Sequence, residues 1–237
     1  MTKPIIGVIS KHFFKDYIRP DMYIRDEVKQ AVFDNGGIAI GILLPRDEKL
    51  KANDNWDNNL TENEFNDLIA QINLCDGIIF QGGGFCDNYE VIVAKYCYEN
   101  NIPTLGICCG QHVMVRALGG TIKKIDKLED HKQNDKKYAH SIKLKLNSKI
   151  YQIINKSEIM VNSRHRKITS DHPKLVVTAS SIEGYPEVVE SPDKTFYMAV
   201  QFHPESLYKF DTSMNNIFKK FIDVCSEERK KCKQLIR

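Results

Sequence analysis

Short apolar runs alternate with helix-like segments in the first half of the chain. Residues 4–9 form an apolar run that predicts a buried strand, and the apolar residues of 23–35 recur at helical spacing. Gly36 then follows, as glycine commonly follows the last turn of a helix, and Thr61 with Glu64 forms a capping-box pattern at another helix start. This alternation predicts parallel βαβ units. The expected strands are 4–9, 38–44, 76–80 and 104–107, and the expected helices are 23–35, 61–71, 89–100 and 110–118.

The pattern changes after residue 120. Residues 141–146 alternate between apolar and polar side chains, as in a strand with one buried face. Further apolar runs follow without a long helix between them, so these strands should be largely antiparallel. No internal repeat and no low-complexity linker is visible, and we therefore predict one α/β domain over residues 1–237. The strand-like runs are 141–146, 158–161, 175–179, 187–190 and 196–202, and a closing helix covers 215–225.

The bulk composition is that of an ordinary globular protein. Of the 237 residues, 42% are hydrophobic and 27% are charged, and the net charge is +3 with histidine neutral. This balance does not favour nucleic-acid binding, which needs clustered basic residues, and the basic run at 229–233 fits a solvated helix end. No apolar stretch has the length of a transmembrane helix, and the N-terminus lacks the apolar core of a signal peptide. We therefore expect a cytoplasmic protein with neither nucleic-acid nor membrane partners.

Cysteine and histidine positions indicate neither a disulfide nor a metal site. The seven cysteines are an odd number and contain no C-x-x-C, so neither a disulfide framework nor a zinc knuckle is indicated. Most of them should be small core residues. Four histidines lie scattered in loop-like or strand-edge contexts, with no pair at metal-ligand spacing on a helix: His12, His131, His140 and His172. We therefore predict no metal ion.

The strongest chemical signal lies in residues 104–111, T-L-G-I-C-C-G-Q. A buried strand runs into Cys108 and then into a helix, with Gly106 and Gly110 on either side. A residue at such a sharp turn is presented at the carboxyl end of the sheet, where α/β proteins bind ligands. The N-terminus of the following helix favours thiolate over thiol. Cys108 is therefore the candidate nucleophile; Cys109 competes for the role, and a core residue that ends a strand is the structural alternative.

The segment Q-F-H-P-E at 201–205 supplies a candidate base. A strand delivers His203, Pro204 turns the chain, and Glu205 follows. In this order His203 would move the proton and Glu205 would orient the imidazole. Alone the tripeptide fits a surface loop, but together with a cysteine at a strand–helix turn it indicates a Cys-His-Glu site.

Attack on an amide also needs N–H donors that stabilise the oxyanion. The N–H of Cys109 is one candidate by position. The glycine loop 82–84, after the strand 76–80, is the other, because glycine permits conformations that turn an N–H into a pocket. A simple tight turn explains this loop as well, whereas a phosphate-binding loop would need the G-K-[S/T] continuation, which is missing.

These motifs resemble those of the class I glutamine amidotransferases. G-I-C-x-G after a strand and Q-F-H-P-E about a hundred residues later carry the likeness. The start P-I-I-G-V, the glycines at 36–37, the loop 82–84 and V-N-S-x-H at 161–165 resemble the branch that contains the γ-glutamyl-γ-aminobutyrate hydrolases, the peptidase C26 group. The likeness covers residues 4 to about 206.

The resemblance implies a fold and a set of roles. It implies a flavodoxin-like sheet flanked by helices, a Cys-His-Glu triad and no cofactor. The implied substrate is a small γ-glutamyl compound, cleaved through a γ-glutamyl thioester. The triad maps to Cys108, His203 and Glu205, the oxyanion donors to Cys109 with Gly83 or Gly84, and the substrate-binding positions to Gln111, His112, Asn162, Ser163 and His165.

The recognition residues depart from the family pattern. The usual G-I-C-R-G-H-Q is G-I-C-C-G-Q-H here, so His112 stands where the family has the glutamine that helps to hold the glutamyl substrate. Arg166 and Lys167 stand where a histidine and a glutamine are common. Added cations would suit a substrate with an extra carboxylate, and two solvent-facing side chains explain them equally well. We therefore expect retained chemistry on a substrate that the sequence does not specify.

Three functions fit these residues. The first is a stand-alone hydrolase that cleaves a γ-glutamyl amide and releases glutamate and an amine. The second is a glutaminase subunit that delivers ammonia to a partner synthase. The third is a non-catalytic protein that binds a γ-glutamyl ligand on the same fold. The sequence favours the first, and a homodimer is a possible assembly.

Overall fold

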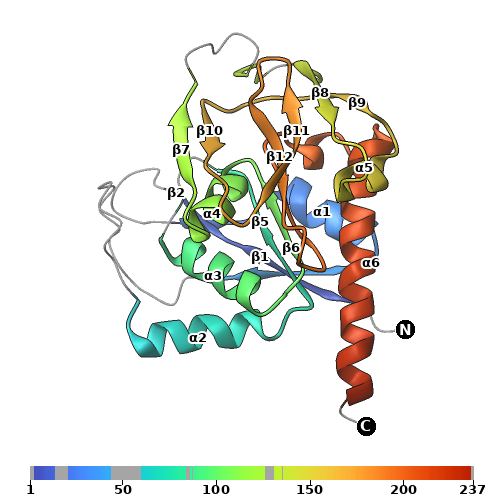
Figure 1. Ribbon diagram of the computed structural model, residues 1–237. Coiled ribbons are helices and arrows are strands. Elements are labelled where there is room, and N and C mark those ends of the chain that lie inside the picture. Colours follow the sequence, from blue (N-terminus) through green and yellow to red (C-terminus); the bar gives the residue numbers. More distant parts are fainter. Residues whose placement is uncertain are drawn as a thin grey trace.

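A computed structural model describes residues 3–13, 21–43, 60–83, 86, 88–125, 131–134 and 136–235. Figure 1 shows a twisted sheet with helices on both faces, as expected for a flavodoxin-like α/β fold. Gly84 and part of the strand expected at 38–44 lie outside the described residues. The helices are α1 (Asp26–Asp34), α2 (Glu62–Ile72), α3 (Asn88–Glu99), α4 (Cys109–Ala117), α5 (Lys149–Ile154) and α6 (Thr212–Leu235), with the short 3₁₀ helix η1 (Pro204–Ser206).

Nine strands of the described chain form the central sheet. In spatial order they are β4 (Ile38–Ile42), β1 (Ile5–Ile9), β5 (Gly77–Phe80), β6 (Thr104–Ile107), β13 (Tyr197–Val200), β12 (Pro186–Glu190), β11 (Val176–Ser181), β8 (His140–Leu144) and β9 (Glu158–Val161). The pairs from β4 to β13 are parallel. The pairs from β13 to β9 are antiparallel. The sheet therefore has a parallel half and an antiparallel extension, which meet at β13.

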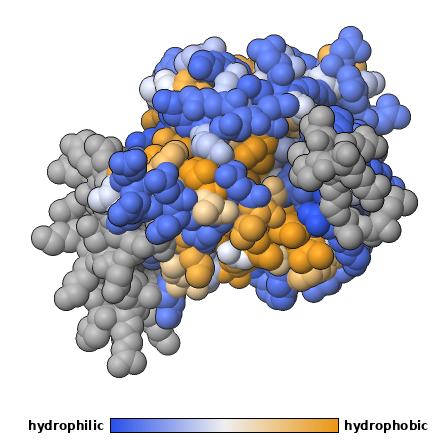
Figure 2. Space-filling model, turned by 90° about the horizontal axis from the view of Figure 1, so that it is seen from below, coloured by the Kyte–Doolittle hydropathy of each residue, from blue (hydrophilic) through white to orange (hydrophobic). Residues whose placement is uncertain are grey.

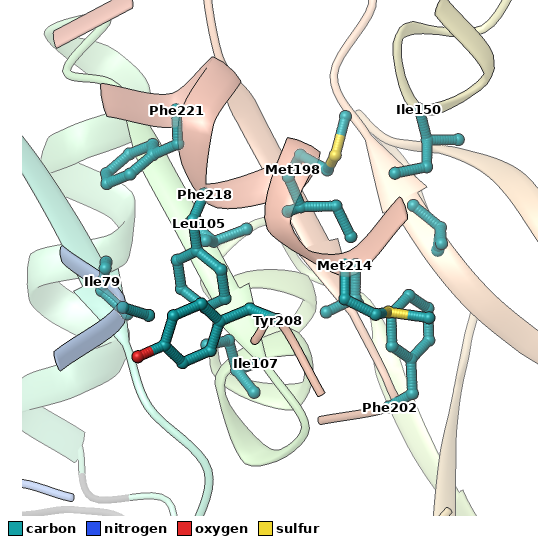
Figure 3. Close-up of a cluster of buried hydrophobic side chains, with 14 of the residues drawn as sticks. Ile79, Leu105, Ile107, Ile150, Met198, Phe202, Tyr208, Met214, Phe218 and Phe221 are labelled. Atoms are coloured by element: carbon teal, nitrogen blue, oxygen red, sulfur yellow. The ribbon is translucent and has the colours of Figure 1, made fainter. Parts of the chain in front are cut away.

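Each face of the parallel half is covered by its own apolar core. Successive strand residues point to opposite faces, so Leu105 and Ile107 join the core on the α1 and α6 side. Ile78 and Phe80 join the core on the α2, α3 and α4 side. Figure 3 shows aromatic side chains of α6 lying over the strands on the first face. Two covered faces explain why these strands read as continuous apolar runs.

The structure adds two features to the predicted arrangement. The run 196–202 contains β13, which pairs antiparallel with β12 but parallel with β6, so it belongs to both halves of the sheet. The sequence also gave no indication of several short elements. These are α5 and two small pairs, β2 (Lys11–Phe13) with β3 (Asp21–Tyr23) and β7 (Thr121–Lys124) with β10 (Lys167–Ser170). They are three to six residues long and partly exposed, so their apolar periodicity is weak.

The surface of the described chain is mixed. In the view from below, apolar side chains gather in the middle of the face and polar side chains surround them (Figure 2). Among the described helices, none combines the length and the apolar composition that crossing a bilayer requires.

Candidate active site

Cys108 lies at a sharp turn between β6 and α4. Its backbone has φ 52° and ψ −104°, a conformation that L-residues rarely adopt, and α4 begins at the next residue. A Cβ atom at Gly106 would lie 2.5 Å from the sulfur of Met114, and one at Gly110 would collide with the carbonyl of Phe80. Both glycines therefore permit the close packing that forms this turn. The prediction that the turn is centred on Cys108 is confirmed.

His203 stands between Cys108 and Glu205. Its Nδ1 lies 2.7 Å from Glu205 Oε1, and its ring also hydrogen-bonds to Cys108. Burial disfavours the imidazolium, but the charges of Glu205 and Cys108 outweigh burial and raise the pKa of His203 to about 10. His203 is therefore protonated at neutral pH. Pro204 starts η1, and this tight turn places Glu205 beside the ring it contacts.

The Asn162 side chain fixes the backbone of His203. Its Oδ1 accepts from the N–H of His203 at 2.7 Å, and its Nδ2 donates to the His203 carbonyl at 2.8 Å. Both polar atoms of the amide are thus engaged with His203. The neighbouring Ser163 donates to the carbonyl of His131 at 2.7 Å. Asn162 and Ser163 therefore shape the site through the backbone, and direct contact with substrate stays a prediction.

Gln201 is a site residue to which the sequence assigned no role. Its Nε2 lies 3.8 Å from Cys108 Sγ, and its Oε1 lies 3.0 Å from His112 Nε2. Burial lowers the pKa of His112 to about 4, so its imidazole is neutral. Gln201 directly follows β13 and lies two residues before His203, so its place in the Q-F-H-P-E motif was the available signal. Gln111, by contrast, points into the fold and donates to the carbonyls of Glu187 and Ala199 at 3.4 Å.

A buried lysine lies beside the glycine loop. Lys11 Nζ contacts both carboxylate oxygens of Glu90, at 2.6 and 2.7 Å, and lies 3.6 Å from Cys109 Sγ. Its methylene groups lie about 3.3 Å from where a Cβ atom of Gly83 would be. Gly82 packs on the other side, where an added Cβ would lie 2.8 Å from Cε1 of His203. The loop thus lies between His203 and the Lys11–Glu90 pair. Sequence reasoning missed this pair because its members are 79 residues apart.

The structure places the predicted oxyanion donors near Cys108 but does not test their role. Cys109 is the first residue of α4, where backbone N–H groups point out of the helix N-terminus. Gly83 lies in the loop that follows β5, and Gly84 lies outside the described residues. Cys109 and Gly83 remain predicted donors.

The structure contains a disulfide that the cysteine spacing did not indicate. Cys86 and Cys109 are joined by a disulfide, with Cα atoms 6.4 Å apart. The bond ties the loop before α3 to the start of α4. It was not predictable from the cysteine spacing, because packing of α3 against α4 brings together residues 23 positions apart. The thiols of Cys97 and Cys225 are buried, as expected for core cysteines.

Two of the histidines expected to be scattered are clustered in the interior. His131 and His140 lie with His165 and Glu187, and all four side chains are buried. His165 was predicted to contact substrate; its ring faces this cluster, and burial lowers its pKa to about 4. Arg166 and the side chain of Lys167 are exposed, which agrees with two solvent-facing cations.

Comparison with known proteins places the site in a family. Residues 85–205, which include Cys108, His203 and Glu205, match the model of the peptidase C26 family. The chain belongs to the peptidase C26 family. It is therefore of the glutamine amidotransferase type.

The relatives share this type. The CTP synthase of Chlamydia caviae is 26% identical over 178 residues, which cover 61% of this chain and 33% of that protein. A glutamine amidotransferase-like protein of Rickettsia prowazekii is 26% identical, with 86% of this chain and 92% of that protein covered. The glutaminase domain of Trypanosoma brucei CTPS with bound acivicin superposes with a TM-score of 0.67 at 18% identity, covering 94% of each chain. The chain spans about a third of the length of the CTP synthases it matches.

Proposed function

We propose that this protein is a cysteine-nucleophile hydrolase that cleaves the γ-glutamyl amide bond of a small γ-glutamyl compound. The observation that supports this best is the arrangement of three residues. Cys108 has a rare backbone conformation at the end of β6. His203 contacts Cys108 and is hydrogen-bonded to Glu205. Strain of this kind persists where the surrounding structure imposes it, and it is common at catalytic nucleophiles.

The proposed reaction runs through a thioester. His203 already holds the proton at neutral pH, and the Cys108 sulfur attacks the γ-carbonyl carbon as the thiolate of a thiolate–imidazolium pair. The oxyanion forms near the N-terminus of α4, where the Cys109 N–H is the expected donor. His203 then protonates the departing amine, and a γ-glutamyl thioester remains. Neutral His203 then takes a proton from water, which attacks the thioester and releases glutamate, and this restores the Cys108 thiolate beside protonated His203.

The pair His112–Gln201 is the proposed recognition element. It lies beside the nucleophile, and the Gln201 amide approaches both the sulfur and the His112 ring. A neutral imidazole and an amide can hydrogen-bond the polar end of a γ-glutamyl group. Cys108 is only 8% exposed, which favours a slender small-molecule substrate of the γ-glutamyl-γ-aminobutyrate type over a folded protein.

The decisive experiment is a mass-spectrometric time course with the purified protein. The panel holds γ-glutamyl-γ-aminobutyrate, other γ-glutamyl amines, γ-glutamyl peptides and glutamine. We expect glutamate release from at least one γ-glutamyl amide, and a loss of at least about 10³-fold in Cys108→Ala, since the nucleophile itself is removed. Cys75→Ala, which removes a half-buried thiol before β5, is the matched control and should retain activity. Turnover that survives Cys108→Ala would exclude Cys108 as the nucleophile.

Two alternatives give other outcomes. Release of glutamate from glutamine alone would support a glutaminase subunit, the function that the match to part of CTP synthase motivates. Binding of γ-glutamyl compounds without turnover by folded protein would support a non-catalytic binding protein. The homodimer and the cytoplasmic location remain predictions, and light scattering after size-exclusion chromatography tests the first.

A further inference from the structure

A buried cluster of three histidines and one glutamate lies in the antiparallel extension. His131 precedes β8, His140 begins β8, His165 follows β9, and Glu187 lies in β12. One nitrogen from each imidazole and one carboxylate oxygen all lie within 4.8 Å of one another. The residues are far apart in sequence, so the pairing of the strands brings them together.

The facing polar atoms of this cluster find no hydrogen-bond partner among the described residues. They include Nε2 of His140 and His165, both ring nitrogens of His131 and both oxygens of Glu187. The nitrogens lie 3.5 Å (His165), 3.6 Å (His140) and 3.9 Å (His131) from Glu187 Oε1. Hydrogen bonds between such atoms measure about 2.7 to 3.2 Å. Burying this many polar atoms without partners is strongly destabilising, so the arrangement needs another explanation.

Contacts on the outer side of the rings orient them toward a common centre. Nδ1 of His140 lies 3.2 Å from the carbonyl of Ser141, and Nδ1 of His165 lies 3.2 Å from the carbonyl of Lys167. A ring that donates its Nδ1–H to a carbonyl presents the lone pair of Nε2 on its other side. Metal-bound histidines are held in this way, with the second nitrogen donating to a carbonyl or carboxylate.

His131 faces the centre of the cluster with Nδ1, whereas His140 and His165 face it with Nε2. Its Nε2 faces Glu183 Oε2 at 3.6 Å, and its Nδ1 faces Glu187. Glu183 is the carboxylate that would accept the Nε2–H, leaving the lone pair of Nδ1 for the centre. Glu183 thus has the position of an orienting partner, and Glu187 that of a ligand.

We propose that His131, His140, His165 and Glu187 bind one divalent transition-metal ion, with Zn²⁺ as the expected occupant. Nitrogen and carboxylate ligands about 2.0 to 2.1 Å from a tetrahedral ion lie about 3.3 to 3.5 Å from one another. The distances between the imidazole nitrogens and Glu187 Oε1 are close to that edge length. Three imidazoles and a carboxylate suit Zn²⁺ and neighbouring first-row ions, whereas Mg²⁺ and Ca²⁺ prefer all-oxygen sites.

The ion would have a structural role. Each ligand side chain is no more than 7% exposed, and four protein ligands close a tetrahedral shell. The N–H of His165 and the hydroxyl of Ser163 both donate to the His131 carbonyl, at 2.9 and 2.7 Å. Asn162, in the same segment, holds His203. The ion would therefore fix the segment that carries both Asn162 and a ligand, and through it the position of His203.

The test measures metal content in the full chain purified without chelator and without an affinity tag that binds metal. Mass-spectrometric elemental analysis should find about one equivalent of zinc per chain. Glu187→Gln, which is nearly isosteric, and His140→Ala should each lose most of it. His172→Ala is the matched control, because His172 is half-buried outside the cluster and contacts Thr169; it should keep the metal.

A second measurement keeps the proposal testable if a variant fails to fold. Wild-type protein is stripped with a chelator and titrated with Zn²⁺ or Co²⁺ alone. We expect the melting temperature to rise by about 5 to 10 °C with zinc, and Co²⁺ to give the visible absorption of a tetrahedral site. A wild-type protein that carries less than about a tenth of an equivalent of any first-row metal, and that shows neither response, would overturn the proposal.

Discussion

At the scale of single residues, chemistry and placement were predictable to different degrees. The turn at Cys108 needs glycines around it, and His203 and Glu205 lie two residues apart, so local sequence indicates all three. Gln201 lies in the same motif, but its contact with His112 depends on how β13 packs against α4. Lys11 approaches Cys109 from β2, at a distance of 98 positions in the chain. Local sequence therefore indicates the candidate reacting groups, whereas the residues that surround them follow only from packing.

The first prediction concerns the proton on His203. Glu205→Gln removes the nearest negative charge, so the pKa of His203 should fall from about 10. Because the proposed reaction needs protonated His203 to release the amine, the alkaline limb of kcat/KM should move from near pH 10 to lower pH. The rate at neutral pH should fall about 10²-fold or more, since the imidazole also loses its orienting partner. Rate measurements from pH 5 to 10.5 on the best substrate of the panel check this.

The raised pKa of His203 also determines how the stability of the protein depends on pH. The folded-state pKa of His203 lies above its ordinary value of 6.5, so the pair stabilises the native state most fully below about pH 6.5. That stabilisation declines as the pH rises and is lost by about pH 10. Cys108 and, at longer range, His165 also face the His203 ring. Both residues are retained in Glu205→Gln. An alkaline limb that stays in place in Glu205→Gln would contradict the assignment of Glu205.

At the scale of elements, the strength of the local signal decided what was predicted. The capping box of Thr61 and Glu64 starts α2 as expected, with the side chain of each residue bonded to the backbone of the other. The closing helix was expected at 215–225, whereas α6 extends to Leu235. Its last turns are charged and lack apolar periodicity. Arg229 nevertheless anchors them to Asp76 beside β5 at 2.7 Å, a tertiary contact that no helical pattern encodes.

The second prediction concerns the apolar face of α6. Phe221 lies against the sheet (Figure 3) and is fully buried. Its ring centroid is 5.4 Å from that of Phe196. Phe221→Ala should lower the free energy of unfolding by about 3 to 5 kcal/mol, because a large cavity opens in the core. Lys220→Ala, on the exposed neighbouring position, should change it by less than about 0.5 kcal/mol. Urea unfolding followed by circular dichroism measures both. Equal effects of the two changes would show that α6 does not pack as described.

At the scale of the whole molecule, the sheet joins two halves of different character. The parallel half has helices over both faces and two apolar cores. The antiparallel extension contains the buried histidine–glutamate cluster, and through Asn162 it also holds His203. The candidate site is therefore divided, with Cys108 on the parallel half and Asn162, which holds His203, on the extension. A conformational change in the antiparallel extension should therefore change the position of His203.

The third prediction compares amide hydrogen exchange in the two halves of the sheet. Zinc added to chelator-treated protein should slow amide exchange in β8, in residues 163–166 and in β12 by about tenfold or more, because an ion bound to the native state opposes local opening. Exchange in β1 and β5 should stay unchanged, since no ligand comes from those strands. Protection that is uniform over the chain, or absent, would contradict a metal ion bound in the antiparallel extension.

The sequence by itself determined the alternation of strands and helices, the turn that presents Cys108, and the H-P-E step that pairs His203 with Glu205. Each of these depends on contacts within a few residues, where glycine, proline and apolar spacing act directly. The tertiary structure alone decided the disulfide between Cys86 and Cys109, the Lys11–Glu90 pair and the histidine–glutamate cluster. These groups lie far apart along the chain and become neighbours only when strands pair and helices pack, a pairing that no local periodicity records.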